Sequence, residues 1–188
     1  MNVPTFKLAF IGAPGAGKTT CIGALSDIPP VCTDVECTDE LIATKATTTV
    51  AFDYGEMSLG DDGRLLLYGL PGQARFQYMY SVVREGLLGT VLLVDAVAAN
   101  GLDGLAETLQ TYAHELRQVP CVVALNKHPD PDEAFKSACK RLLRLHHLVV
   151  PILTVDARNK ADIATLFNLL FLQLEYGFEP RTQTATAQ

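Results

Sequence analysis

Short apolar runs recur along the chain and alternate with segments in which apolar residues repeat at helical spacing. Hydrophobic and β-branched residues dominate the runs, which is typical of strands. The runs lie at Thr5–Ile11, Thr49–Leu59, Arg64–Tyr68, Thr90–Asp95, Cys121–Asn126 and Pro151–Thr154. Helices are predicted at Thr19–Leu25, Gln77–Leu87, Asp103–Leu116, Pro131–His146 and Lys160–Tyr176.

This alternation predicts one α/β domain whose mostly parallel, six-stranded sheet is doubly wound, with helices on both faces. Asp61, Asp62 and Gly63 form a tight turn between the second and third runs, so those two strands are expected to pair as an antiparallel edge hairpin. Residues 91–96 and 121–126 are almost wholly apolar, which is typical of central strands. Ligands of such sheets bind outside the carboxyl ends of the strands.

Two segments do not follow the alternation. Residues 27–45 are acidic and have no clear periodicity, and a loop of this length in a compact domain is usually functional. The alternative is a solvated, partly helical excursion. Residues 177–188 have little to bury, so we expect a domain spanning residues 1–176 and a mobile tail after it.

The first strand runs into a phosphate-binding loop. Residues 12–19 read GAPGAGKT and match the pattern G-x-x-x-x-G-K-[ST]. Glycines let successive backbone N–H groups face a phosphate, Lys18 supplies charge to the β- and γ-phosphates, and Thr19 offers a hydroxyl to Mg²⁺. The sequence therefore predicts a nucleoside triphosphate site at Gly12, Ala13, Pro14, Gly15, Ala16, Gly17, Lys18, Thr19 and Thr20.

Two further motifs could contact the γ-phosphate and the metal. Thr47, Thr48 and Thr49 precede the second strand, where a hydroxyl can complete the Mg²⁺ shell and form a first switch. The alternative is that these β-branched residues only begin an edge strand. After the third strand, Gly72 can donate its N–H to the γ-phosphate and Gln73 can orient an attacking water, which would form a second switch.

Charge and composition narrow the class of protein. The 188-residue chain has a formal net charge of −6, which argues against nucleic acid as its main partner. No apolar run has the length of a membrane span, no signal peptide is evident, and neither terminus carries a lipidation motif, so we expect a cytoplasmic protein without a direct membrane anchor. Five cysteines without a C-x-x-C pair fit a reducing compartment, in which most serve as small core residues.

The phosphate loop, T-x-x-x-D at residues 49–53, P-G-Q-x-R-F at 71–76 and N-K at 126–127 resemble the motifs of Ras-like small GTPases. The resemblance is strongest to their bacterial MglA/Rup branch and covers residues 6–176. It implies a Ras-like P-loop three-layer fold that binds GTP and GDP, holds Mg²⁺ through Thr19 and Thr49, and controls an effector through two switches. GTP hydrolysis and a Roadblock-type regulator or GTPase-activating partner are also implied, and the departures described next predict that hydrolysis is slow.

This sequence departs from the Ras pattern near the metal. Gly69 stands where the second switch usually opens with aspartate, which should weaken Mg²⁺ binding. Thr48 stands where MglA-like proteins are expected to carry arginine, leaving Arg75 and Lys45, or a partner, to stabilise the transition state. Asp53 lies inside the second predicted strand, and we interpret it as structural.

A second departure affects base recognition. The resemblance makes Asn126 and Lys127 frame the guanine, but Pro129 replaces the base-reading aspartate and Asp130 follows one residue late. Asp130 reaches the base only if the loop bulges, and otherwise guanine selectivity is relaxed. Asp156, Ala157 and Arg158 align with a loop whose alanine N–H contacts the base, with Asp156 orienting that loop. Alternatively, Asp156 is a loop residue near a helix start.

Two other functions fit the phosphate loop. One is a P-loop kinase that uses ATP or GTP, although the arginines of this chain form no cluster suited to a second substrate. The other is a nucleotide-binding scaffold with little hydrolysis, which the missing aspartate and arginine favour. The switch is the reading we prefer, because Thr49 and Gln73 have no place in the kinase pattern.

Overall fold

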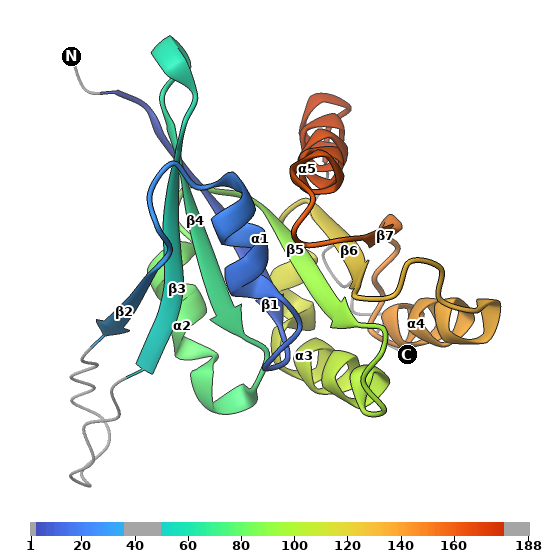
Figure 1. The fold of residues 1–188 in the computed structure, drawn as a ribbon. Coiled ribbons are helices and arrows are strands. Elements are labelled where there is room, and N and C mark those ends of the chain that lie inside the picture. Colours follow the sequence, from blue (N-terminus) through green and yellow to red (C-terminus); the bar gives the residue numbers. More distant parts are fainter. Residues whose placement is uncertain (1–2, 36–49, 179–188) are drawn as a thin grey trace, which may run out of the picture.

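The structure is a computed structural model that describes residues 3–35 and 50–178 (Figure 1). Within those ranges the strands are β1 (Thr5–Gly12), β2 (Val31–Val35), β3 (Val50–Ser58), β4 (Arg64–Pro71), β5 (Leu87–Asp95), β6 (Cys121–Asn126) and β7 (Ile152–Val155). The α-helices are α1 (Lys18–Leu25), α2 (Tyr78–Val83), α3 (Gly101–Leu116), α4 (Glu133–Leu145) and α5 (Lys160–Glu175). Two 3₁₀ turns, η1 (Gly60–Asp62) and η2 (Ala74–Phe76), complete the described part.

The strands form one mixed sheet in the order β2-β3-β4-β1-β5-β6-β7. β1 pairs in parallel with β4 and β5, and β6 pairs in parallel with β5 and β7. β3 is antiparallel to both β2 and β4. The predicted α/β class, the mostly parallel sheet and the antiparallel hairpin are thus confirmed.

The predicted number of strands was wrong, because the described residues contain seven rather than six. The additional strand is β2, which lies within the segment 27–45 that we had expected to be irregular. β2 pairs with β3 on one side only, so backbone hydrogen bonding forms this edge strand without the apolar pattern of a buried one. The β3–β4 hairpin consequently lies one strand inside the edge.

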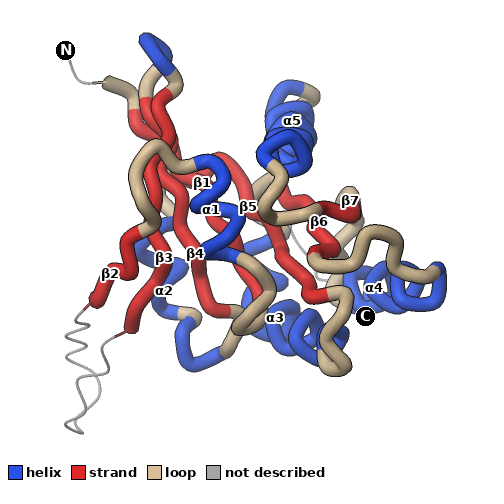
Figure 2. The backbone as a smooth tube through the Cα atoms, viewed as in Figure 1, coloured by secondary structure: helices blue, strands red, loops and turns tan. Residues whose placement is uncertain are grey.

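Helices cover both faces of the sheet (Figures 1 and 2). α1 and α5 lie on one face, where their apolar residues pack with Leu8, Phe10 and Val122 of the sheet. α2, α3 and α4 lie on the other, around Ile11, Leu92 and Tyr112. Because helices bury β1, β5 and β6 from both sides, their loops at the carboxyl ends are held on a rigid base.

Most predicted boundaries differ from the structure by one to three residues, but the helix predicted at 77–87 is much shorter. α2 ends at Val83, and β5 already begins at Leu87. Gly86 has a φ of 76°, and this left-handed backbone turns the chain from the helix into the strand. The apolar pair Leu87-Leu88 therefore belongs to a strand that is longer than predicted.

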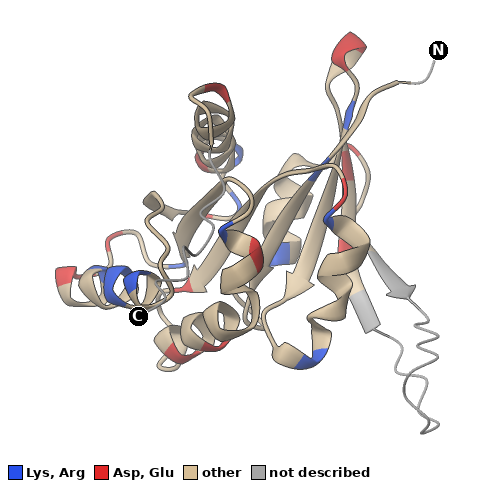
Figure 3. Ribbon diagram, turned by 180° about the vertical axis from the view of Figure 1, so that it is seen from behind, with Lys and Arg blue, Asp and Glu red and all other residues tan. Residues whose placement is uncertain are grey.

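Charged residues are unevenly distributed over the described surface (Figure 3). Lys and Arg gather on α4. Three of them, Lys140, Arg141 and Arg144, line a surface hollow together with Ser137 and Leu145. The thiols of Cys21, Cys121 and Cys139 are buried and free, as expected for core residues, and burial raises the pKa of Cys121 to about 12. No helix in the described ranges combines the length and apolar character needed to cross a membrane.

Candidate functional site

The phosphate loop connects β1 to α1, as its sequence predicts. Gly17 precedes the helix with a φ of 110°, and a Cβ on this residue would lie 2.3 Å from Nδ2 of Asn126, so only glycine fits both the backbone and the space. The Lys18 ammonium donates to the carbonyl oxygens of Gly12 and Ala13, at 3.0 Å each. The Lys18 side chain therefore folds back onto the start of the loop, where its ammonium charge can face a phosphate.

The hydroxyl of Thr19 contacts a carboxylate on another strand. Thr19 Oγ1 donates to Oδ2 of Asp53 on β3 at 2.6 Å, which is a short, charge-assisted hydrogen bond. Burial lowers the pKa of Lys18, and the nearby Asp53 carboxylate opposes part of that decrease. The sequence reading of Asp53 as purely structural missed this contact with the predicted metal ligand.

The Thr19 hydroxyl and the Asp53 carboxylate are the oxygen groups beside the phosphate loop that are available to a cation. The described residues contain no group of three or more His, Cys, Asp or Glu side chains arranged to bind a metal. This donor set suits Mg²⁺, which keeps several waters and uses one or two protein oxygens together with phosphate oxygens. Thr19 Oγ1 is the protein oxygen so placed, whereas Thr49, the other predicted ligand, lies outside the described residues, as do Lys45, Thr47 and Thr48.

The second-switch residues lie beside the phosphate loop at the end of β4. The N–H of Gly72 donates to the carbonyl oxygen of Gly12 at 3.0 Å, which ties the two loops together. Gln73 accepts a hydrogen bond at Oε1 from the Arg75 guanidinium at 3.1 Å, and that guanidinium lies 4.7 Å from the centre of the Phe76 ring. The predicted pair Gln73 and Arg75 is thus together, with each side chain engaging the other.

The second-switch segment is anchored to α3. The buried Tyr112 hydroxyl lies 3.0 Å from the carbonyl oxygen of Pro71 and 3.2 Å from that of Phe76, so it bridges both ends of the turn. Gln77 donates to the Thr111 carbonyl at 3.0 Å. A movement of this segment must therefore break contacts with α3.

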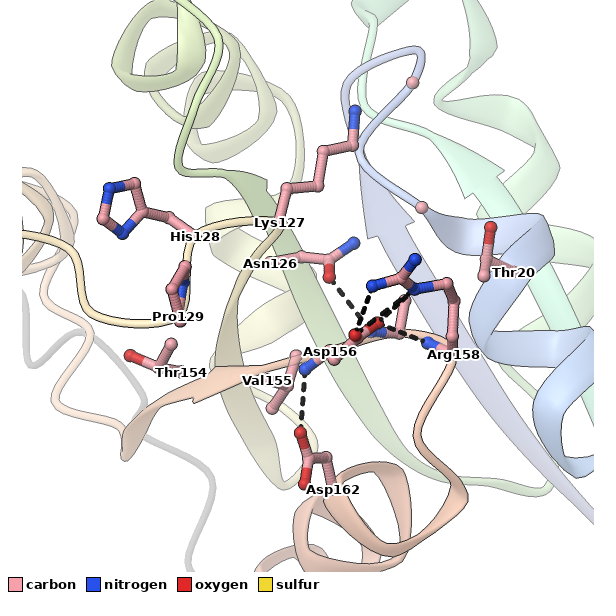
Figure 4. Close-up of a pocket in the computed structure, with 13 residues that line it drawn as sticks. Thr20, Asn126, Lys127, His128, Pro129, Thr154, Val155, Asp156, Arg158 and Asp162 are labelled. Carbon is pink, nitrogen blue, oxygen red and sulfur yellow. Dashed lines mark hydrogen bonds and ion pairs between the residues drawn. The ribbon is translucent and has the colours of Figure 1, made fainter.

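A cavity of about 850 Å³ extends from the phosphate loop across the carboxyl ends of β6 and β7 (Figure 4). Its lining combines residues of three loops that are far apart in sequence. They are Gly15, Gly17, Thr20, Asn126, Lys127, His128, Pro129, Thr154, Val155, Asp156, Ala157, Arg158 and Asp162. The volume is of the size that small-molecule sites usually have.

Asn126 joins the three loops. Its buried side chain donates from Nδ2 to the Ala16 carbonyl at 2.9 Å and accepts at Oδ1 from the Ala157 N–H at 3.0 Å. Asn126 is thus a structural clamp between the phosphate loop and the loop after β7. The Ala157 N–H, which the sequence assigned to the base, is bonded to this asparagine instead.

Lys127 turns away from the asparagine and pairs with the end of β5 (Figure 4). Its backbone has a φ of 75°, and Nζ lies 2.6 Å from Oδ2 of Asp95. Partial burial by itself raises the pKa of Asp95, but hydrogen bonds from Lys127 and from the N–H groups of Val97 and Ala98 outweigh that effect and lower the pKa. The ion pair holds the lysine stem at one side of the cavity.

Asp130 does not reach the cavity. Its exposed carboxylate pairs with Lys136 of α4 at 3.0 Å, while its N–H donates to Nδ1 of His128 at 3.2 Å. Pro129 lines the cavity in the place predicted for the base-reading aspartate. The bulge needed for Asp130 to face a base is therefore absent from this arrangement, because the residue is turned toward α4.

The loop after β7 is closed by an ion pair. Arg158 donates to the Asp156 carboxylate from Nε at 2.9 Å and from its terminal nitrogen at 2.6 Å (Figure 4). These side-chain bonds, together with the Arg158 N–H, lower the pKa of Asp156 to about 2. The N–H of Asp156 donates to Oδ2 of Asp162 at 2.8 Å. Asp156 thus holds its own loop through Arg158 and Asp162, and its predicted role in presenting that loop to a base stays a prediction.

A scan against protein families matches residues 31–170, well over half of the chain, to the model of a conserved hypothetical ATP-binding protein. The chain belongs to this family. The matched range includes the second switch and both base-side loops but begins after the phosphate loop. None of the curated proteins compared with the chain matches it.

Solved structures with a similar fold include the cytosolic domain of the T. maritima FeoB iron transporter in GDP form I. It has a TM-score of 0.59 and 15% identity over 97% of this chain and 68% of that one. The GMPPNP form of the T. maritima domain has a TM-score of 0.59 and 14% identity, over 97% of this chain and 69% of that one. The cytosolic domain of L. pneumophila FeoB has a TM-score of 0.54 and 21% identity, over 88% of this chain and 67% of that one. The family member thus has the Ras-like P-loop fold of these domains.

Sequence reasoning missed three carboxylates at the site, namely Asp53, Asp95 and Asp162. Each acts through a partner on another element: Thr19, Lys127 and the N–H of Asp156. A signal existed for two of them. Asp95 ends a predicted central strand, where polar residues line ligand sites, and Asp53 stands opposite Gly69 when the hairpin is counted outward from its turn.

Proposed function

We propose that this chain is a GTP-binding molecular switch that holds GTP or GDP with Mg²⁺, hydrolyses GTP slowly to GDP and presents its switch segments to an effector. The observation that carries the proposal is the single cavity joining the phosphate loop to the loops that end β6 and β7. We infer that one end of this cavity would take the phosphates and the other the base. The FeoB domains in GDP and GMPPNP forms support guanine as the base.

Each part of the nucleotide has residues that could hold it. The loop from Gly12 to Thr20 would surround the phosphates, with Lys18 facing the β- and γ-phosphates. Mg²⁺ would be held by Thr19 and Thr49, and when bound it would neutralise charge on the phosphate oxygens. Asn126, Lys127 and the segment 156–158 would frame the base.

The switch itself would involve the bond between Gly72 and Gly12. In this structure the Gly72 N–H donates to the Gly12 carbonyl. To donate to a γ-phosphate it has to leave that carbonyl, and the Tyr112 hydroxyl would resist movement of the adjacent Pro71. A triphosphate would thereby favour one of two arrangements of the segment, as γ-phosphate contacts do in other switches.

The surface of that segment would contact the partner. Phe76 and Tyr78 are half-buried against the core, whereas Tyr80 is 6% exposed and belongs to the core. We therefore propose Phe76 and Tyr78 as the aromatic contacts, and a Roadblock-type regulator or GTPase-activating protein as the partner that the MglA/Rup resemblance suggests. Such a regulator should bind the GMPPNP-loaded chain more tightly than the GDP-loaded chain.

The base is tested by competition. A fluorescent GDP bound to the purified chain is displaced in parallel with GTP, GDP, ATP and ADP in the presence of Mg²⁺. We expect both guanine nucleotides to compete at lower concentrations than either adenine nucleotide. Displacement by the adenine nucleotides alone would contradict the guanine assignment and favour the function that the family's name describes.

Hydrolysis is tested by single-turnover measurements with GTP. Gln73→Leu should slow hydrolysis by about 10²-fold, an effect of the size typical for losing a positioned catalytic group, with nucleotide affinity unchanged. Gln118→Leu, on the turn after α3, is the matched control. Equal rates for Gln73→Leu and wild type would remove Gln73 from catalysis, and transfer of phosphate to an added nucleotide would favour a kinase.

A scaffold with little hydrolysis is the second function, and one observation favours it. The side-chain amide oxygen Oε1 of Gln73 accepts a hydrogen bond from Arg75 and so faces a protein donor instead of a water. Arg75→Ala separates the two functions. A switch restrained by this bond should hydrolyse GTP faster after the substitution, unless Arg75 itself stabilises the transition state, in which case the rate falls. A scaffold shows no change.

A further inference from the structure

Asp53 fills the space that a side chain at position 69 would take. The two residues are partners in the antiparallel register of β3 and β4. A Cβ built on Gly69 would lie 3.0 Å from both Cβ and Oδ2 of Asp53, and 3.2 Å from Cδ1 of Ile22. Because both distances to Asp53 are shorter than ordinary contacts, the glycine and the aspartate depend on each other.

The Asp53 carboxylate also acts on the phosphate loop. It accepts a hydrogen bond from the Thr19 hydroxyl at 2.6 Å, so the lone pairs of Oγ1 are directed away from Asp53 and stay available to a cation. Asp53 is half-buried as a residue, and its hydrogen bond to Thr19 lies on the exposed side, where water can also reach the carboxylate. A carboxylate next to a metal-binding hydroxyl orients that ligand and favours a cation beside it.

We propose that Asp53 is the positioning carboxylate of the Mg²⁺ site and supplies from β3 the charge that Gly69 cannot supply from β4. This inference rests on the proposed binding of nucleotide with Mg²⁺. Asp53 holds the Thr19 hydroxyl and accepts hydrogen bonds from water in the cation's shell. The absence of aspartate at position 69 therefore does not leave the site without a carboxylate.

The relocation changes which switch senses the metal. β4 leads directly into the second switch at Gly72, whereas β3 begins at Val50, next to the predicted first-switch residue Thr49. With the carboxylate on β3, binding of the cation acts first on β3 and its antiparallel neighbour β2. The second switch would then respond mainly to the γ-phosphate.

The test measures Mg²⁺ dependence of nucleotide release, without any turnover. The full chain is loaded with fluorescent GDP, and its release is followed over a range of Mg²⁺ concentrations and in EDTA. Asp53→Asn preserves the shape of the side chain but removes its charge. We expect the Mg²⁺ concentration that half-maximally slows release to rise by about 10- to 100-fold, while release in EDTA changes by less than about twofold, because the phosphate loop is intact.

An exchange variant provides the sharper test. Asp53→Gly combined with Gly69→Asp moves the carboxylate to the partner strand and removes the Cβ that would collide with it. This double variant should regain most of the Mg²⁺ dependence that Asp53→Asn loses. Asp62→Asn, an exposed carboxylate at the far end of the same hairpin, is the control and should behave as wild type. Thermal melting without nucleotide verifies that each variant folds.

The outcomes separate this inference from the proposed function. If wild type releases nucleotide in a Mg²⁺-dependent manner and Asp53→Asn does so equally, Asp53 only braces Thr19 and the inference is wrong, although the proposed function stands. If wild type shows no Mg²⁺ dependence, both are wrong. A loss in Asp53→Asn at unchanged release in EDTA supports the inference even if the exchange variant fails to fold.

Discussion

The two ends of the cavity are organised in different ways. At the proposed phosphate end, which consists of the loop backbone and Lys18, the lysine donates hydrogen bonds to the carbonyl oxygens of Gly12 and Ala13 in the loop itself. At the base end, side chains are paired with one another: Lys127 with Asp95, and Asp156 with Arg158. To bind phosphate, only Lys18 would have to give up its present hydrogen bonds. To bind a base, the existing ion pairs at the other end would have to open before their donors and acceptors become available.

This difference suggests a division of labour. The phosphate end should supply most of the affinity, and it does so for any nucleoside triphosphate, because phosphates are common to all of them. The base end should supply selectivity, but less than a site with an aspartate aimed at the base, since the side chain of Pro129 offers no acceptor and Asp130 is paired with Lys136. Substitutions at the two ends should therefore have distinguishable effects.

The largest effect is expected at the phosphate end. In the proposed site Lys18→Ala removes a charge from the phosphates, and the loss of about two charge-assisted hydrogen bonds corresponds to roughly 100-fold or more in affinity. Affinities for GTP and ATP, measured by calorimetry, should fall by similar factors. Lys140→Ala on α4 is the control. A loss confined to one of the two nucleotides would contradict the division of labour.

The next effect concerns the residue that joins the two ends. Asn126→Ala leaves the Ala16 carbonyl and the Ala157 N–H without their buried partner, at a cost of about 2 kcal/mol in the free energy of unfolding. Urea unfolding measures this cost. Because both loops lose their brace, affinity should also fall for guanine and adenine nucleotides alike. Unchanged stability would mean that water replaces the asparagine and that the two ends are not mechanically coupled.

How far the sequence predicted these features depended on whether they rest on local or on long-range contacts. The phosphate loop was predicted residue by residue, because its geometry requires glycines at fixed spacing between a strand and a helix. The central strands were predicted for a similar reason, since burial on both faces leaves an apolar run. β2 was missed because an edge strand needs only backbone pairing with β3.

The base end was harder to predict because its contacts join residues distant in sequence. Whether Asp130 faces the cavity or α4 depends on Lys136, and the partner of the Ala157 N–H depends on how Asn126 is rotated. The role of Asp53 depends on strand register: counting from Ser58 opposite Arg64 places Asp53 opposite Gly69. That register could have been read from the position of the turn at residues 60–63, whereas the side-chain directions could not.

A moderate effect is expected when the missing acceptor is restored. Pro129→Asp places a carboxylate on the cavity lining, where it can accept hydrogen bonds from the guanine N1–H and amino group. The ratio of GTP to ATP affinity should rise by about tenfold, a conservative share of what a buried hydrogen-bonding pair contributes to discrimination. Competition with fluorescent GDP measures it, and Asp130→Asn, which removes a carboxylate paired with Lys136, should leave the ratio unchanged. An unchanged ratio in Pro129→Asp would mean that the base does not approach this loop.

The smallest effect concerns the ion pair that closes the loop after β7. Arg158 lowers the pKa of Asp156 from its ordinary value of 3.8 to about 2. Since the folded-state pKa is the lower one, the contribution of the pair to the folded loop is complete above the ordinary value and is lost as the pH falls through about 2. In Arg158→Ala the pKa of the Asp156 carboxyl should rise from about 2 toward 3.8, although the N–H of residue 158 still donates to it, and carbon-detected NMR of that carboxyl can follow the change. Nucleotide affinity at neutral pH should change by less than about threefold, because exposed ion pairs contribute little. If Asp156 titrates near 3.8 in the wild type as well, the Asp156–Arg158 ion pair is not formed in solution. The two ends of the cavity would then differ in loop mobility and not in side-chain pairing.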